Sequence, residues 1–351
     1  MGELDIVPLD PADPDAMAAW YAVYFASATF ERPHSTPRML QEMRAQFQAE
    51  NPGQRVLGWT GLVERRVAVV GSMLLPLKDN LRQVWIDVNT LPVLRNRGAG
   101  SQMLDHLFAV SRQCGRSLVA TEAAYPYDGP PDGAGHHYVE FLLRRGFRFG
   151  LGDVMRVLDL PADEKMLRGF ADEAAPHHED YEIRQFVGPV PDDIIDSFGQ
   201  LIGSLNTQAP TGKMELESEV FDAERIRADE RVFMESGRTK YTTVAIARGG
   251  TLAAYSELVV PRHDPGRAYQ WGTLVLPEHR GHRLGFATKA RNLLWLQRKC
   301  PSLRILSTYN AEVNLHMVEL NSAMGFRPVE RLGELQRNLE NELPCETARA
   351  R

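Results

Sequence analysis

Two stretches of this sequence combine arginine and glycine at a spacing suited to holding a phosphate group. The first, Arg95-Asn-Arg-Gly98-Ala-Gly100, follows the alternating apolar run at 84–88 and precedes apolar residues at helical spacing. The second, Arg280-Gly-His-Arg283-Leu-Gly285, has similar surroundings. In each, a strand, a tight turn and a helix follow one another. Because unpaired N–H groups at a helix start bind anions, each turn is a candidate pyrophosphate site.

These stretches belong to a longer repeat. Pro92, Arg95 and Gly100 recur 185 residues later, and the Gly-Phe pair at 146–147 recurs at 325–326. Landmarks in one order at nearly one spacing indicate a duplicated unit, and 351 residues suffice for two cores. We therefore expect an N-terminal domain over 1–160, a linker over 161–180 and a C-terminal domain over 181–351.

The periodicity of apolar residues predicts the same order of elements in each unit. A strand and two helices precede three or four strands, and the glycine-turn helix is followed by strand, helix and strand. This order predicts an α/β (α+β) fold, in which each domain has a mixed, mostly antiparallel central sheet flanked by helices.

Composition limits the partners and the compartment. A net charge of −6 without a basic face argues against nucleic acid, and no apolar stretch approaches the about 18 residues that span a membrane. Cys114, Cys300 and Cys345 have no metal-type spacing, and the adjacent His136 and His137 lack a third ligand, so we expect no metal. An odd cysteine count and a start without a targeting pattern predict a cytoplasmic protein.

The repeated motif resembles the acetyl-CoA-binding core of the GNAT superfamily of N-acetyltransferases. A strand ending in an apolar-Pro pair, Arg-x-x-Gly-x-Gly, a helix and a later Gly-Phe carry the resemblance, which covers nearly the whole chain twice. The first copy fits completely, whereas Arg283 replaces the first glycine of the second copy. The tandem arrangement resembles that of mycothiol synthase and other actinobacterial enzymes, and it implies two GNAT-fold domains.

This resemblance implies acetyl-CoA as the cofactor. It places beside the cofactor, in the second unit, Leu274, Val275, Leu276, Arg280, Gly281, His282, Arg283, Leu284, Gly285, Asn310 and Asn314, and, in the first unit, Val88, Asn89, Arg95, Arg97, Gly98, Ala99 and Gly100. The arginines that open the loops suit charge-assisted bonds to phosphate. The alternative is that each arginine caps its loop or pairs with a carboxylate.

The catalytic groups are harder to assign from the sequence. The family's usual acid, a tyrosine four residues before the glycine of Gly-Phe, is replaced by Leu142 and Asn321. We therefore consider Glu257 as a base acting through water, and Tyr309 and His316 as acids. The alternatives are a salt bridge for Glu257, a packing role for Tyr309 and a surface position for His316.

The function predicted from these observations is acetyl transfer to the primary amine of a small molecule. The second domain is the preferred catalytic one, although the intact loop of the first leaves the reverse open. The alternatives are a non-catalytic acyl-CoA-binding sensor or scaffold, and an acyl or aminoacyl transferase of the same duplicated fold. The polar loop 205–212 is a candidate lining of the acceptor pocket. We expect a monomer or a homodimer.

Overall fold

The computed structural model describes residues 4–340, and its elements follow the predicted order in both halves, except that a short additional helix, Leu205–Gln208, lies in the predicted polar loop 205–212 of the second half. The first half contains β1 (Asp5–Pro8), α1 (Pro14–Thr29), α2 (Leu40–Gln48), β2 (Gln54–Val63), β3 (Arg66–Pro76), β4 (Gln83–Thr90), η1 (Pro92–Leu94), α3 (Ala99–Gln113), β5 (Leu118–Pro126), α4 (His137–Leu143) and β6 (Arg148–Asp159). The second half contains β7 (Tyr181–Val187), η3 (Asp192–Ile194), α6 (Ile195–Gly203), α7 (Leu205–Gln208), α8 (Ala223–Glu235), β8 (Arg238–Ala247), β9 (Leu252–Pro261), β10 (Arg267–Val275), η4 (Pro277–His279), α9 (Leu284–Lys299), β11 (Ile305–Ala311), α10 (Leu315–Ala323) and β12 (Arg327–Asn338).

In each half, helices cover both faces of the sheet. Val69 and Val70 on β3 point to opposite faces, as neighbours on a strand must. Val69 packs beneath α3 and α4, and Val70 packs beneath α1 and α2. In the second half, α9 and α10 cover one face, and α6 and α8 cover the other. The predicted fold class is therefore confirmed.

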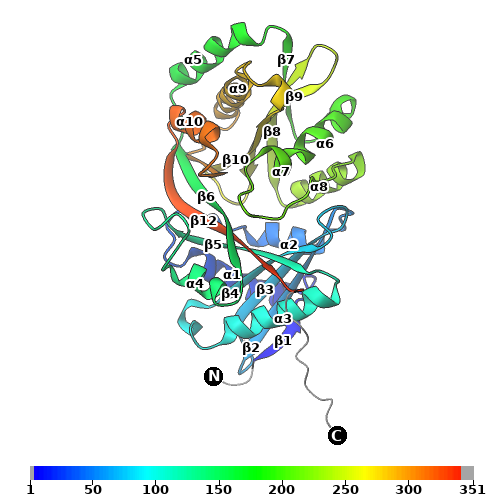
Figure 1. The fold of residues 1–351 in the computed structure, drawn as a ribbon, viewed down its shortest axis with the longest axis vertical. Helices are drawn as coiled ribbons and strands as arrows, with labels where there is room; N and C mark the ends of the chain where they lie inside the picture. Colours follow the sequence, from blue (N-terminus) through cyan, green and yellow to red (C-terminus); the bar gives the residue numbers. More distant parts are fainter. Residues whose placement is uncertain (1–3, 341–351) are drawn as a thin grey trace.

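The strands of both halves form one 12-stranded sheet, in the order β1-β2-β3-β4-β5-β12-β6-β11-β10-β9-β8-β7. The final strands are exchanged, because β12 of the second half pairs with β5 and β6 of the first half pairs with β11. Figure 1 shows β6 and β12 crossing the middle of the molecule together. Each half therefore supplies a strand to the sheet of the other.

The segment 161–180 is not the plain linker that its charged composition suggested. It contains α5 (Glu164–Ala174) and the short η2 (Ala175–His177). Leu167 and Ala171 lie on one face of α5 and are buried in the second core, where the helix packs on α9. The apolar residues of this segment recur at helical spacing, and this amphipathic pattern outweighs the surrounding charges.

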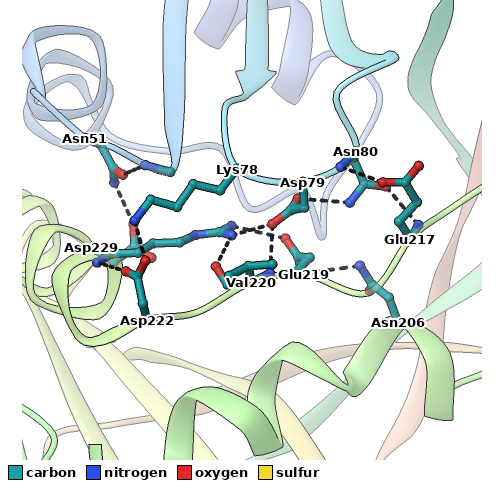
Figure 2. Close-up of polar contacts among 12 residues, drawn as sticks. Asn51, Lys78, Asp79, Asn80, Asn206, Glu217, Glu219, Val220, Asp222 and Asp229 are labelled. Atoms are coloured by element: carbon teal, nitrogen blue, oxygen red, sulfur yellow. Dashed lines mark hydrogen bonds and ion pairs between the residues drawn. The ribbon is translucent and has the colours of Figure 1, made fainter. Parts of the chain in front are cut away.

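A polar cluster joins the halves at the turn between β3 and β4 (Figure 2). Asp79 on this turn accepts a hydrogen bond of 2.6 Å from Arg225 of α8, and both side chains are more than nine-tenths buried. Beside them, Lys78 contacts Asp222, and the backbone N–H groups of Asn80 and Glu217 donate to each other's side chains. The cluster fixes one half against the other.

Three further expectations concern the chain as a whole. No helix in residues 4–340 is long and apolar enough to cross a membrane. In the same range, no three His, Cys, Asp or Glu side chains are grouped so that they could hold a metal ion. Cys114 and Cys300 are free thiols, and Cys345 lies outside the described residues.

Candidate functional site

In both halves, two parallel strands part at the point where the resemblance places a cofactor. β4 pairs with β5 only from Gln83 to Trp85, and β10 pairs with β11 only from Arg267 to Gln270. Beyond these residues the strands diverge, although β4 and β10 continue to Thr90 and Val275. Each divergence, here called a splay, exposes backbone groups of two strands to whatever lies between them.

The turns that follow β4 and β10 share one backbone conformation. Asn96 and Gly281 have φ of 60° and 88°, and Gly98 and Arg283, two residues further on, have φ of 90° and 49°. Each turn therefore has two left-handed positions, of which only one is a glycine. Among the described residues, the N–H groups of 96–101 and 281–286 donate to no backbone acceptor. These groups fit a pyrophosphate.

The remaining predicted turn residues pack the turns against their strands. Ala99 and Leu284 are buried, and a Cβ on Gly100 would lie 3.0 Å from the Thr90 hydroxyl. A Cβ on Gly285 would lie 3.3 Å from Leu320. Gly100 therefore permits close approach of α3 to β4, and Gly285 permits close approach of α9 to α10.

Arg95 does not point toward the free N–H groups. Its guanidinium donates to the Ser27 hydroxyl (3.1 Å), the Ser27 carbonyl and the Tyr138 hydroxyl, and it lies 4.8 Å from the centre of the Phe30 ring. These contacts match the capping alternative rather than a phosphate contact. Arg97 and Arg280 are exposed beside their turns and remain candidates for phosphate binding.

The second turn is partly covered by the segment that precedes β7. The guanidinium of Arg283 lies 3.3 Å from the Glu173 carboxylate of α5. A ring nitrogen of His282 lies 3.0 Å from the carbonyl oxygen of His177, and His279 contacts the Tyr181 hydroxyl. A carboxylate close to this turn opposes a bound phosphate, and no described segment makes the same contacts with the first turn.

Four carboxylates form a row on one face of the sheet, at the mouth of the first splay. Asp87 on β4 and Glu122 on β5 flank the splay. Glu334 on β12 stands directly opposite Glu122, and Asp153 on β6 stands opposite Leu332, two residues from Glu334 on the same face. The last two come from the exchanged strands, so this acidic row is built by both halves.

The carboxyl groups of the acidic row have raised pKa values. Glu122 is reached by solvent but enclosed between the halves, and this desolvation, with Asp87 and Asp153 nearby, raises its pKa to about 7. Desolvation and the same kind of repulsion raise the pKa of Glu334 to about 8, and desolvation raises that of Asp153 to about 6. Carboxyl groups with such pKa values can exchange protons near pH 7.

The loop between α1 and α2 crosses from the first half toward the second. Arg32 forms a two-pronged ion pair with Glu330 of β12, with distances of 2.8 and 2.7 Å. Thr36 lies 3.5 Å from the Tyr309 hydroxyl. The corresponding loop of the second half crosses the other way: Met214 and Leu216 pack with Trp85, Ala120 and Leu151. The acidic row therefore lies between two crossing loops.

The predicted catalytic residues are not brought together. Glu257 is buried and lies 3.1 Å from Lys240, as in the salt-bridge alternative. Tyr309 faces the loop that carries Thr36, and burial raises the pKa of its hydroxyl. His316 is exposed in the first turn of α10. No hydrogen bond or ion pair among the described residues connects any two of them.

The predicted cofactor residues on the strands have mixed surroundings. Asn89 donates a 2.7 Å hydrogen bond to Asp87, while Val88 packs on the first core. Leu274 is buried, and Val275 and Leu276 are partly buried against the second-half cores. Asn314 caps α10, where its side chain accepts a hydrogen bond from the Met317 N–H. Asn310 belongs to a polar cluster that is described below.

The second splay is more filled than the first. β10 has a bulge between Gln270 and Thr273, where β4 is regular. A Cβ on Gly272 in this bulge would lie 2.2 Å from the Tyr255 hydroxyl. Tyr255 thus occupies the space at the mouth of the second splay, on the face where the first splay carries Asp87.

Sequence reasoning missed the acidic row. Asp87 interrupts the apolar alternating run at 84–88, and a carboxylate at this position could have indicated a functional group. The run served only to locate the strand beside the cofactor. Glu122 lies beyond the apolar run 118–120, on the part of β5 that continues to Pro126. Glu334 and Asp153 gave no signal, since only strand exchange brings them to this site.

The sequence matches no protein-family model and no curated protein, whereas solved structures do resemble it. A tandem GNAT protein from the clavulanic acid biosynthesis pathway is 24% identical with a TM-score of 0.75, and the match covers 97% of this chain and all of that one. A GCN5-related N-acetyltransferase from Sphaerobacter thermophilus is 12% identical (TM-score 0.62, 99% of both chains). N-myristoyltransferase from Saccharomyces cerevisiae is 10% identical (0.59, 96% of this chain and 80% of that one). These likenesses establish the fold: two GNAT units in tandem.

Proposed function

We propose that this chain, with its tandem GNAT fold, transfers an acetyl group from acetyl-CoA to the primary amine of a small molecule. We also propose that the first half carries out the chemistry. The observation that carries this proposal is the first splay, which has a free anion-binding turn at one end and the acidic row at its mouth. A thioester held in the splay would lie beside groups able to take up a proton.

Three contacts favour the first half over the second, which the sequence had favoured. Glu173 lies beside the second turn, Tyr255 fills the mouth of the second splay, and Glu257 is paired with Lys240. The first half has no corresponding obstruction among the described residues. A substrate amine approaching Asp87 and Glu122 meets two carboxylates, which attract an ammonium group, although the guanidinium groups of Arg32 and Arg38 also act on both carboxylates.

Separate residues of the first half would bind the cofactor and prepare the amine. The N–H groups of 96–101, together with Arg97, would hold the pyrophosphate of acetyl-CoA, which supplies the thioester. Asp87 and Glu122 orient the incoming ammonium group, and the carboxylate form of Glu122 accepts its proton. The neutral nitrogen can then attack the thioester carbonyl. As the new C–N bond forms and the C–S bond breaks, coenzyme A would leave as its thiolate and take up the remaining proton of the attacking nitrogen, since Leu142 has no proton to supply.

One observation favours a second role for the other half. Its turn has the same backbone conformation as the first, but its splay lacks an acidic row and is narrowed by Tyr255. The second candidate function is therefore binding of an acyl-CoA without turnover. This role corresponds to the sensor or scaffold alternative, restricted to one half of the chain.

The deciding experiment combines cofactor titration with turnover. Acetyl-CoA is titrated calorimetrically into the intact chain and into Arg97→Ala and Arg280→Ala, and release of free CoA thiol is followed with a panel of primary amines. We expect Arg97→Ala to weaken the site that supports turnover. We expect Asp87→Asn with Glu122→Gln to slow turnover about 100-fold while acetyl-CoA still binds.

Two results would contradict the proposal. Absence of acetyl-CoA binding to the intact chain would exclude the acetyltransferase function. Full turnover in the Asp87→Asn, Glu122→Gln variant, combined with its loss in Arg280→Ala, would move the chemistry to the second half.

A further inference from the structure

Behind the second splay lies a cluster of four polar side chains: the buried Lys289 of α9, Asn321 of α10 and Arg156 of β6, and the partly buried Asn310 of β11. The repeat places Leu104 and Leu142 at the positions of Lys289 and Asn321. The strand pairing gives the other two counterparts, when the pair Val84–Val119 of the first half is aligned with the pair Ala268–Leu306 of the second. Ala123 then takes the position of Asn310, and Leu335 takes the position of Arg156. All four counterparts belong to the apolar core of the first half.

The four polar side chains form one chain of hydrogen bonds. Lys289 donates to the carboxamide oxygen of Asn321, and Asn321 donates to the carboxamide oxygen of Asn310 at 2.9 Å. Arg156 donates to the same Asn310 oxygen, also at 2.9 Å. Arg156 reaches this position only because β6 of the first half pairs with β11, so the cluster depends on the strand exchange.

The cluster contains two basic groups and no acid. Lys289 is 1% exposed and Arg156 is 5% exposed, and neither forms an ion pair with a carboxylate of residues 4–340. Glu312 is bonded to Arg331 at 2.7 Å, and Asp153 points to the opposite face of β6. Burial lowers the pKa of Lys289 to about 7, so its amine can lose the charge, but a guanidinium stays protonated. A buried charge without a counter-ion is costly.

The free edge of Arg156 indicates which anion would fit. Its guanidinium donates only through Nη1, to Asn310 and to the Val154 carbonyl, and within the described chain Nε and Nη2 have no hydrogen-bond partner. Nε and Nη2 are the edge with which arginine binds both oxygens of a carboxylate. We propose that the second splay takes up a carboxylate group, bound to this edge of Arg156, with Lys289 as the second basic group of the cluster.

The carboxylate can arrive from two sources: the end of the acyl chain of an acyl-CoA, or a free dicarboxylic acid. The first source rests on the proposed function, since it requires the second turn to bind a coenzyme A ester. The second source does not. In either case the chain would hold two different ligands, a neutral acetyl group in the first splay and an acidic group in the second.

The test compares succinyl-CoA, acetyl-CoA and succinate by calorimetric titration of the intact chain. We expect succinyl-CoA or succinate to occupy the second site about tenfold or more tightly than acetyl-CoA. Arg156→Leu should abolish this preference, and Arg156→Lys, which keeps the charge but loses the planar edge, should remove most of it. Lys289→Leu with Asn321→Leu restores the pair found in the first half, so this double variant should fold and also lose the preference.

Each outcome has one meaning. A preference carried by succinyl-CoA alone supports the acyl chain as the source, and binding of succinate alone supports the free acid. Equal affinities in the intact chain, or a preference that survives Arg156→Leu, would overturn the carboxylate site. If acetyl-CoA binds and turns over at the first splay while no preference appears, only the carboxylate site fails. If neither ester binds anywhere, the proposed function fails.

Discussion

At the scale of single residues, environment rather than residue type separates the two halves. Glu122 and Glu257 are both glutamates on strands beside a splay. Glu122 is enclosed between the halves among other carboxylates, and this desolvation raises its pKa to about 7, whereas Glu257 is buried against Lys240. A carboxylate already paired with a lysine attracts an incoming ammonium group less than an unpaired carboxylate does.

The raised pKa of Glu122 predicts the pH dependence of turnover. The carboxylate must be unprotonated to accept a proton, so kcat/KM should rise through about pH 7 and level off above it. In Glu122→Gln this rise should be lost, and the remaining rate should be about tenfold or more lower at pH 8. The measurement is a pH series of initial rates for both proteins. An unchanged profile in the variant would exclude Glu122 as the base.

At the scale of elements, the two turns reach one conformation with different residues. Gly98 and Arg283 occupy the same left-handed position, at φ of 90° and 49°. A residue with a Cβ tolerates this region at a cost of about 1–2 kcal/mol, which the second turn bears at Arg283 and the first turn bears at its other left-handed position, Asn96. An exposed ion pair such as that of Arg283 with Glu173 offsets little of this strain energy.

The left-handed backbone at positions 98 and 283 predicts that alanine lowers the stability of the chain more at Gly98 than at Arg283. Gly98→Ala should destabilise the chain by about 1 kcal/mol, because the site is spacious and only its positive φ opposes a Cβ. Arg283→Ala is the matched control, since an L-residue already occupies that position, and it should change stability by less than about 0.5 kcal/mol. Urea unfolding measures both. Equal losses in the two variants would show that the turns are not equivalent.

At the scale of the whole molecule, the halves are joined by exchanged strands, crossing loops and a buried ion pair. Arg225 lies 2.6 Å from Asp79 and 3.9 Å from the centre of the Phe221 ring. It also packs against Gly53, where a Cβ would lie 2.6 Å from the Arg225 Nε atom. The acidic row and Arg156 of the second splay exist only in this assembly. Both candidate sites therefore depend on contacts between halves.

The buried pair predicts a large loss when one partner is removed. Arg225→Met leaves Asp79 buried without its counter-charge and should cost about 3–5 kcal/mol in urea unfolding. Adding Asp79→Asn to Arg225→Met should recover part of that loss, so the double variant should be less destabilised than the sum of the two single changes. Strictly additive effects would mean that the pair is not coupled across the interface.

Strand exchange predicts that the halves do not fold separately. A chain of residues 1–180 keeps β6 without β11 and β12, and a chain of residues 181–351 keeps β12 without β5 and β6. Each should lack a cooperative thermal transition by circular dichroism, and mixing the two should restore one together with a complex on size-exclusion chromatography. A cooperative transition in either half alone would contradict this expectation.

The sequence determined what depends on neighbours along the chain. Alternating and helical apolar spacing specified the order of elements, and the repeated Arg-x-x-Gly-x-Gly turns specified the duplication and the anion-binding turns. Local pattern was also misleading in places, as with α5, whose apolar face was obscured by its charges, and with β5, which continues six residues beyond its apolar run 118–120.

Only the tertiary structure decided which side chains share a site. Glu334 lies 212 residues from Glu122 and becomes its neighbour through the pairing of β12 with β5. Arg156 reaches Asn310 through β6 and β11, and Arg95 turns inward to Ser27 and Tyr138 instead of toward the turn that it begins. Pairing between distant strands follows from the burial of whole sheet faces, which no local spacing encodes.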